Sequence, residues 1–299
     1  MPLNRQDPPA RNPACPVQSL HDRAILNVRR PPAPMNEQAG SGAPLIAPGD
    51  LPGWIIHEDE RLLVLNKPGL IVCHPSKNGP WSSLVGAARE YLGLPTVHLV
   101  FRLDRETSGV VVLAKDSVTA AKLQKAMQQR RIGKAYLAIL TGDLTQPVTV
   151  DQALGPDPSS CVTIRSTVVA AGAPGAQAAV THFTPVATGG GFTLVRVGLE
   201  TGRKHQIRAH ALWLGHPVVG DKLYGPDERL YLEFAQHGWT ERHARLLPLS
   251  RQALHCAEID LRLAREPHVF RAALPDELTR FCLERMGIDP QTCSMGPVP

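Results

Sequence analysis

The chain has 299 residues, a net charge of +5 and an apolar fraction of 43%, and it contains six cysteines. No run of about 18 apolar residues occurs, and the first residues are polar and proline-rich, which argues against a membrane-spanning helix and a secretory signal. The cysteines show no CxxC spacing, so a zinc ribbon or a redox motif is not predicted, and we expect reduced thiols in a cytoplasmic protein.

The predicted elements begin after a long proline-rich stretch. Residues 1–50 lack apolar periodicity, and such a segment buries too little apolar surface to offset its ordering entropy, so we expect a disordered or loosely attached arm. We expect one catalytic domain over residues 51–287, with packed structure starting near Trp54, and a flexible tail over residues 288–299.

The next elements are strands and one helix. Residues 61–66, 71–74 and 110–114 are apolar runs that predict strands, the last of them central in a sheet. A helix is predicted after Asp116 or Ser117, with an apolar stripe and an end at the basic residues before a glycine. The stripe comprises Val118, Ala121, Met127 and Leu123, the glycine is Gly133, and the exposed face carries Lys122, Lys125, Gln129 and Arg130.

Strands dominate the rest of the chain. They are predicted at residues 135–140, 179–186, 192–199 and 254–261, with a hairpin at the three glycines before Phe192 and a helix over residues 205–214. Because strands and helices do not alternate regularly, we predict an α+β fold with a mixed, largely antiparallel sheet, flanking helices and loops, and a central cleft.

Positive charge is concentrated in residues 102–134, where eight Lys or Arg and three Asp or Glu account for the whole net charge. Such a segment suits a phosphate backbone, although a solvated helix face is the simpler interpretation of a charge run alone. Within it, Asp104 stands between Arg102 and Arg105, and cations at this distance stabilise the ionised carboxylate. A carboxylate kept ionised in a partly dry cleft can act as a nucleophile, or it can form a purely structural ion pair.

A second polar segment, residues 201–210, enters the predicted helix. Arg203 and Arg208 offer planar groups that bind carboxylate or phosphate. His205 and His210 are five positions apart, not the four of a zinc helix, and no HExxH glutamate is present, so no metal site is predicted.

Four segments together resemble the RluA-type pseudouridine synthase family. They are KPGLIVCHPS, VFRLDRETSGVVVLAKD, RRIGKAYLAILTG and LETGRKHQIRAHALWLGHPVVGDKLYG. The resemblance implies the pseudouridine synthase catalytic fold and an isomerase that converts uridine in ribosomal or transfer RNA, with no cofactor. Phe101 stands where the family usually has histidine, and the first 50 residues do not resemble the S4-type domain of some members.

The resemblance also implies roles for individual residues. Asp104 would be the nucleophile, acting at the glycosidic bond or on the base, Arg208 would hold it ionised, and Tyr136 would contact the target base. Substrate-binding residues would include Arg102, which fills the gap left by the flipped uridine, and Ile207, a pocket wall. The remaining substrate-binding candidates, taken from the basic helix entrance, are Arg203, Lys204 and His205.

Two rival functions stay open from the sequence. The chain could be a catalytically inactive RNA-binding protein of the same fold, for which Phe101 is the only hint. It could also be a hydrolase that uses Ser108 with a histidine and Asp104, although no GxSxG elbow precedes a helix. We expect a monomer.

Overall fold

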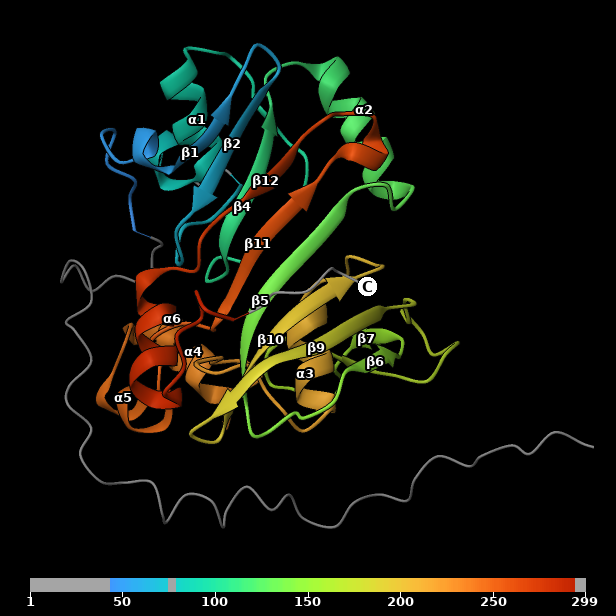
Figure 1. Cartoon of the computed structure of the whole chain (residues 1–299), viewed down its shortest axis with the longest axis vertical. Coiled ribbons are helices and arrows are strands. Elements are labelled where there is room, and N and C mark those ends of the chain that lie inside the picture. The colour runs from blue at the N-terminus through green and yellow to red at the C-terminus, as the bar shows by residue number, and fades with distance from the viewer. Residues whose placement is uncertain (1–43, 75–78, 294–299) are drawn as a thin grey trace, which may run out of the picture. The chain divides into compact units, whose positions relative to one another are not determined.

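The structure, a computed structural model, describes residues 44–74 and 79–293 (Figure 1). All of these belong to one compact unit. Most of the predicted arm and half of the predicted tail, residues 1–43 and 294–299, lie outside the described residues, as do residues 75–78 of the first family-like segment.

Packed structure starts earlier than the predicted position near Trp54. The side chain of Ile46 is buried, and its backbone N–H donates to the carbonyl of Trp81 at 2.8 Å. At the other end, Ile288 packs against the main core. A few residues of the predicted arm and tail are therefore part of the folded unit.

The centre of the fold is a ten-stranded sheet with the order β1-β2-β4-β11-β5-β10-β9-β6, to which β3 adds at β4 and β12 at β11. Only the β4–β11 pair is parallel among these strands. The predicted mixed, largely antiparallel sheet is thus confirmed. The strands are β1 Ile55–Glu58, β2 Leu62–Lys67, β3 His98–Leu99, β4 Ser108–Ala114, β5 Gly133–Thr141, β6 Val148–Asp151, β9 Val180–Gly189, β10 Phe192–Leu199, β11 Leu254–Asp260 and β12 Val269–Arg271.

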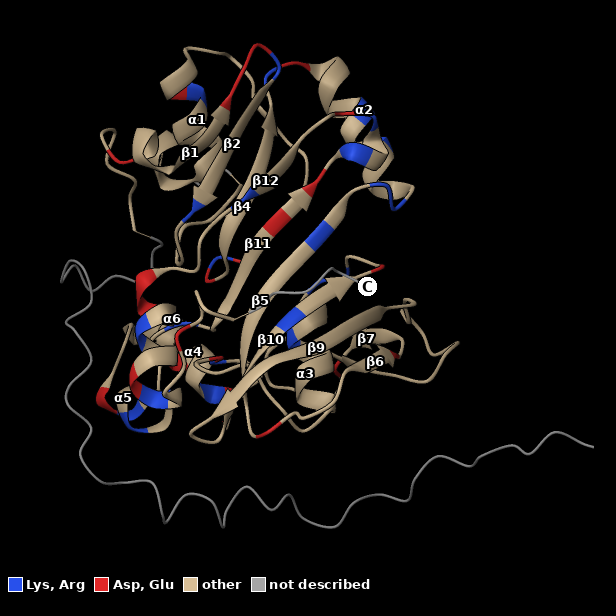
Figure 2. Ribbon diagram, viewed as in Figure 1, with Lys and Arg blue, Asp and Glu red and all other residues tan. Residues whose placement is uncertain are grey.

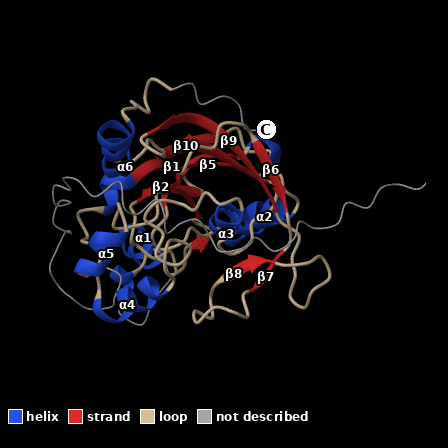
Figure 3. Cartoon of the chain, turned by 90° about the horizontal axis from the view of Figure 1, so that it is seen from below, coloured by secondary structure: helices blue, strands red, loops and turns tan. Residues whose placement is uncertain are grey.

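Helices and a small ribbon complete the unit. Viewed from below, α2 and α3 lie on the same side of the curved sheet (Figure 3), and of the two only α3 packs against the small ribbon, at β8. No helix among the described residues is long and apolar enough to cross a membrane. The elements are α1 Leu84–Leu92, α2 Ser117–Gln128, α3 Gln206–Trp213, α4 Arg229–His237, α5 Glu241–Leu246, α6 Asp276–Phe281, β7 Leu154–Pro156 and β8 Ser166–Val168.

Strand β4 is the most buried strand of the sheet, with all seven residues buried. It lies between β2 and β11 and is covered on both faces, which explains a continuous run of valines instead of an alternating pattern. The hairpin between β9 and β10 is also confirmed. Its loop residues Gly190 and Gly191 have φ values of 61° and 79°, as a two-residue type I′ turn requires.

The helix predicted after Asp116 is present, but its buried face differs from the predicted one. The Asp116 side chain caps α2 by accepting from the backbone N–H of Thr119 at 2.8 Å. The buried residues are Thr119, Ala120, Leu123 and Ala126, whereas Val118 is 78% exposed. The helix ends before the predicted glycine, because Arg130 adopts a left-handed φ of 58° and Gly133 already begins β5.

The strand predicted at residues 71–74 is wrong. Ile71 and Cys73 are buried, but the segment is a loop whose carbonyls have other partners. The carbonyl of Ile71 accepts from the Lys67 ammonium at 2.8 Å, and that of Cys73 accepts from the N–H of Val85 in α1 at 3.1 Å. Apolar character here reflects burial beneath α1 and not sheet pairing.

Candidate active site

Asp104 lies in the loop that leads into β4. The backbone N–H of Thr107 donates to the carbonyl of Asp104 at 3.1 Å, which closes a turn over these four residues. Ser108 and Gly109 already belong to the strand, so the turn ends directly before β4.

Buried cations hold this loop by its backbone. Lys67 donates to the carbonyl of Arg105 at 3.1 Å, and the Nη1 of Arg251 donates to the carbonyl of Glu106 at 2.9 Å. Lys67 and Arg251 are both at most 4% exposed. The position of Asp104 is therefore set by side chains from β2 and from the segment before β11.

Gly109 allows β4 to approach β11 directly behind the Asp104 loop. It has a φ of 112°, and a Cβ atom at this position would lie 2.2 Å from the carbonyl oxygen of Cys256. Gly109 pairs with Cys256 in the parallel register of β4 and β11. No side chain fits between these two backbones, so the site requires glycine here.

The carboxylate of Asp104 forms an ion pair with Arg208 from α3. The Nη1 of Arg208 donates to its Oδ2 at 2.9 Å. The other side of the guanidinium binds Asp221 through two hydrogen bonds, at 2.6 and 2.9 Å, and Asp221 also accepts from the backbone N–H groups of Leu223 and Tyr224. Arg208 therefore lies fixed between two carboxylates, one fully buried and one facing solvent.

The charges of this group are set by their partners. Burial alone would raise the pKa of Asp104, but the charge of Arg208 and its hydrogen bond outweigh this effect and hold the pKa below its ordinary value. The two carboxylates raise the pKa of Arg208 despite its burial. Asp104 is thus an ionised carboxylate at neutral pH, with a third of its side chain exposed.

The cation that pairs with Asp104 is Arg208 from α3, and not one of the arginines next to Asp104 in the sequence. Arg102 is exposed, and the guanidinium of Arg105 lies over the ring of Phe234, 5.2 Å from its centroid. The ion pair implied by the family resemblance is present, whereas stabilisation by the flanking arginines, as predicted from the local sequence, is not the main effect.

His205 lies beside the ion pair. Its Nε2 is 3.9 Å from the Oδ2 of Asp104, and its Nδ1 is 3.1 Å from the hydroxyl of Tyr224. Burial, together with the charge of Arg208, lowers the pKa of His205 to about 4. The imidazole is therefore neutral at pH 7 and acts as a polar wall, not as a second cation.

A cleft of about 220 Å³ opens next to Asp104. Its polar wall includes Lys222, which donates to Glu106 at 2.8 Å and lies 4.4 Å from the ring centroid of Phe234. Lys222 is buried and is held in the wall by these contacts, while the ring of Phe234 offers an aromatic surface to a base. The lining residues are Asp104, Arg105, Glu106, Ile164, His205, Arg208, Lys222, Tyr231, Phe234, Ala235 and Gln252.

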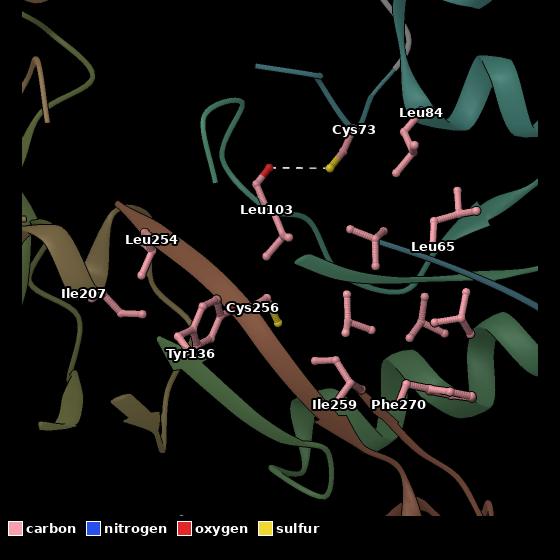
Figure 4. Packing of buried hydrophobic residues seen from close by; sticks show 14 of the residues in the cluster. Leu65, Cys73, Leu84, Leu103, Tyr136, Ile207, Leu254, Cys256, Ile259 and Phe270 are labelled. Atoms are coloured by element: carbon pink, nitrogen blue, oxygen red, sulfur yellow. Dashed lines mark hydrogen bonds between the residues drawn. The ribbon is translucent and has the colours of Figure 1, made fainter. Parts of the chain in front are cut away.

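Tyr136 and Ile207 lie deeper than the cleft and do not line it. Figure 4 shows the Tyr136 ring between Ile207 and Cys256, and both Tyr136 and Ile207 are at most 7% exposed. Burial, followed by the proximity of Cys256, raises the pKa of Tyr136 far above its ordinary value, and the charge of Asp104 adds to this rise. The phenol is neutral and within electrostatic reach of Asp104.

Two of the predicted substrate-binding residues, Arg203 and Lys204, are exposed. Arg203 and Lys204 precede α3, and the Nε of Arg203 donates to the carbonyl of Ala178 at 3.0 Å. Further basic residues lie on α2 and in the loop after it (Figure 2). Positive charge is therefore available on two exposed segments.

The residues that complete the ion-pair group were not predicted from the sequence. Asp221, Lys222 and Tyr224 lie in the segment GDKLYG, which is part of the resemblance to the family but carries no predicted site residue. All three are at most 2% exposed. Two charged residues followed by an apolar residue and a tyrosine give no sign, in one sequence, that the charges are buried.

The hydrolase alternative has little support in the geometry. The hydroxyl of Ser108 does lie 3.0 Å from the Nδ1 of His255, but both residues are at most 1% exposed and the hydroxyl also accepts from Arg251. Asp104 pairs with Arg208 and not with His255. A buried serine of this kind has no access to a substrate.

Comparison with known proteins agrees with this geometry. Residues 61–213 match the family model described as RNA pseudouridylate synthase. The chain belongs to the RNA pseudouridine synthase family. It is 34% identical over 219 residues to the ribosomal large subunit pseudouridine synthase D of Haemophilus ducreyi, an alignment that covers 72% of this chain and 64% of that protein.

A second relative is covered more fully. An uncharacterised RNA pseudouridine synthase of Bacillus subtilis, YjbO, is 34% identical over 234 residues, covering 76% of this chain and 74% of the relative. Among solved structures, human RNA pseudouridylate synthase domain containing 4 aligns over 80% of this chain and 94% of its own, with a TM-score of 0.63 and 27% identity. The predicted pseudouridine synthase fold is thereby confirmed.

Proposed function

We propose that this chain isomerises uridine to pseudouridine in RNA, with the carboxylate of Asp104 as the nucleophile. The observation that carries the proposal is the ionised Asp104, paired with Arg208 at 2.9 Å, at the edge of a cleft of about 220 Å³. The activity is that of the family to which the chain belongs. The assignment of Asp104 as nucleophile is what the family resemblance implies, and the site geometry supports it.

The chemistry requires little beyond such a group. The C1′–N1 bond of uridine breaks, the uracil turns while still bound, and a C1′–C5 bond forms. C5 then loses its proton and N1 takes up a proton, so that atoms and electrons balance overall. A carboxylate can hold the intermediate while the closed site excludes water. We therefore expect the reaction to need no cofactor.

The neighbouring residues have supporting roles in this proposal. Arg208 keeps Asp104 ionised and oriented, and Tyr136, a neutral phenol beside the apolar Ile207, contacts the uracil and assists loss of the C5 proton. Because Tyr136 is buried, the uridine must be flipped out and inserted past the rim, at a cost of a few kcal/mol. Arg102 then occupies the vacated space in the RNA.

The exposed residues Arg203 and Lys204 would bind the RNA backbone, and the neutral His205 would bind the nucleotide beside Asp104. A ribosomal or transfer RNA loop, not a regular duplex, suits this flipping step. We expect a monomer in the cytoplasm, whose catalytic domain comprises residues 51–287 together with the packed residues Ile46 and Ile288 on either side of them.

Mapping pseudouridine in total cellular RNA tests the proposal. RNA from cells that lack this gene is incubated with the protein and treated with carbodiimide, and the modified uridines are located by primer extension. We expect new, site-specific pseudouridine with the unaltered chain and none with Asp104→Asn. RNA binding without new pseudouridine would instead support an inactive RNA-binding protein of the same fold.

A further inference from the structure

Three potential metal ligands meet where β1 and β12, which pair with other strands, lie close to each other. His57 belongs to β1, Asp59 follows it in the turn to β2, and His268 directly precedes β12. One side-chain donor atom from each lies within 4.8 Å of the others. None of the three lines the cleft beside Asp104.

The carboxylate of Asp59 is fixed by its backbone contacts. Its Oδ1 accepts from the N–H groups of Arg61 and Leu62, both at 2.7 Å, while its Oδ2 lies 3.0 Å from the Nε2 of His57. One oxygen therefore holds the turn and the other faces the imidazole. Hydrogen bonds to one carboxylate oxygen are the kind of support that orients a metal ligand.

The two imidazole rings are held by an aromatic neighbour. Phe270 lies 5.3 Å from the ring centroids of both His57 and His268, and the two histidine rings are 5.0 Å apart. All three candidate ligands are half-buried, so they are ordered by packing and still reached by solvent.

The charge around the group does not oppose a cation. Arg61, the nearest basic side chain in sequence, is bound through two hydrogen bonds by Glu266, at 3.1 and 2.9 Å. Lys115 is paired with Glu58 at 2.8 Å. These cations are neutralised by their own partners, which leaves the Asp59 carboxylate as the local negative charge.

We propose that His57, Asp59 and His268 bind one divalent transition-metal ion of the Zn²⁺ or Ni²⁺ type, with water in the remaining positions. Two imidazoles and one carboxylate are donors that such ions prefer over Mg²⁺ or Ca²⁺. Metal–ligand bonds of about 2.0–2.2 Å require the donor atoms to lie closer together than 4.8 Å. Rotation of the half-buried side chains can bring the donor atoms to this separation.

The bound ion would join two hairpins that are distant in sequence, β1–β2 and β11–β12. Because the ion binds only where folding brings these hairpins together, it stabilises the folded chain in proportion to its occupancy. The spacing of the three ligands along the chain fits no local motif, which is why no metal was predicted from the sequence.

Calorimetric titration of the untagged full chain with Ni²⁺, after removal of metals with a chelator, tests the proposal. Nickel is the probe because imidazole and carboxylate bind it well, while it competes less than zinc for free thiols. We expect one saturable high-affinity site, and a rise of about 5 °C or more in the thermal unfolding midpoint at saturating Ni²⁺.

The variants Asp59→Asn and His268→Gln should each weaken Ni²⁺ binding by at least about tenfold, since even supporting residues of metal sites have effects of this size. Asp59→Asn keeps an oxygen that can accept from Arg61 and Leu62, so the turn survives. His237→Gln, an exposed histidine at the end of α4, serves as the matched control and should bind as the unaltered chain does. Absence of saturable binding, or equal binding by all variants, would overturn the proposal.

Discussion

Arg208 shows how a single side chain sets the charge of the site. Its guanidinium donates to Asp104 on one side and to Asp221 on the other, and Asp221 is fully buried. Removing one partner of a buried ion pair leaves an uncompensated charge and typically costs more than the pair contributes. The least exposed member of the group, Asp221, is therefore its structural anchor.

Asp221→Asn should lower the free energy of unfolding by about 3–5 kcal/mol, because the Asn amide presents N–H groups to the guanidinium and removes the buried countercharge. Urea unfolding measures this loss. Asp227→Asn is the matched control, since Asp227 pairs with the partly exposed Arg242 and should change stability by about 1 kcal/mol or less. Equal losses in both variants would contradict the anchor role of Asp221.

At the scale of elements, the junction of β4 and β11 positions the Asp104 loop. Gly109→Ala should destabilise the chain by several kcal/mol and reduce activity, because the added Cβ meets the backbone of Cys256 at a positive φ. Gly93→Ala separates the cost of a positive φ from the cost of the steric clash. Gly93 has a φ of 62° with nothing within 4 Å of the added Cβ, so this substitution should cost only about 1 kcal/mol. Thermal unfolding of both variants gives the comparison, and a Gly109→Ala chain as stable as Gly93→Ala would rule out the close approach.

The same junction makes the stability of the fold depend on pH, through the buried His255 of β11. Burial lowers the pKa of His255 to about 4 from its ordinary 6.5, so between these values the unfolded chain binds a proton that the folded chain does not. The contribution of His255 to stability is complete above pH 6.5 and is lost as the pH falls towards 4. Urea unfolding at pH 7.5 and pH 5 should show lower stability at pH 5, with a smaller difference in His255→Gln. If the stability of His255→Gln differs between pH 7.5 and pH 5 as much as that of the unaltered chain, His255 is not the source of the pH dependence.

Elements with strong local signals were predictable from the sequence, and those defined by distant partners were not. The valine run of β4, the glycine turn before Phe192 and the Asp116 cap were all visible locally. The buried face of α2 was misassigned because the apolar Val118 is exposed while the polar Thr119 packs inward. Packing partners, not composition, decide such cases.

The same contrast between local signals and distant partners applies to the candidate site. The family resemblance placed Asp104 and Arg208 together, and the structure pairs them at 2.9 Å. Asp221 was not predicted, because its importance depends on being buried against a guanidinium from another element. The roles of Tyr136, Arg102 and the other substrate-binding candidates stay predictions.

For the whole molecule, RNA binding should depend strongly on salt. Replacing both Arg203 and Lys204 with alanine should weaken binding and reduce the slope of log affinity against log salt by about 0.7–0.9 for each phosphate that the variant no longer neutralises. Filter binding of a ribosomal RNA fragment at several salt concentrations measures the slope. Lys125→Gln on α2 is the matched control, and a larger effect there would place the RNA on α2 instead.

The central claim is that the Asp104 carboxylate carries out the isomerisation. Tritium at C5 of uridine is released to water only when the C1′–C5 bond forms, so its release from labelled RNA reports the chemical step directly. We predict release by the unaltered chain and a loss of at least about 1000-fold in Asp104→Asn at an unchanged unfolding midpoint. Release by Asp104→Asn at a rate near that of the unaltered chain would contradict the account.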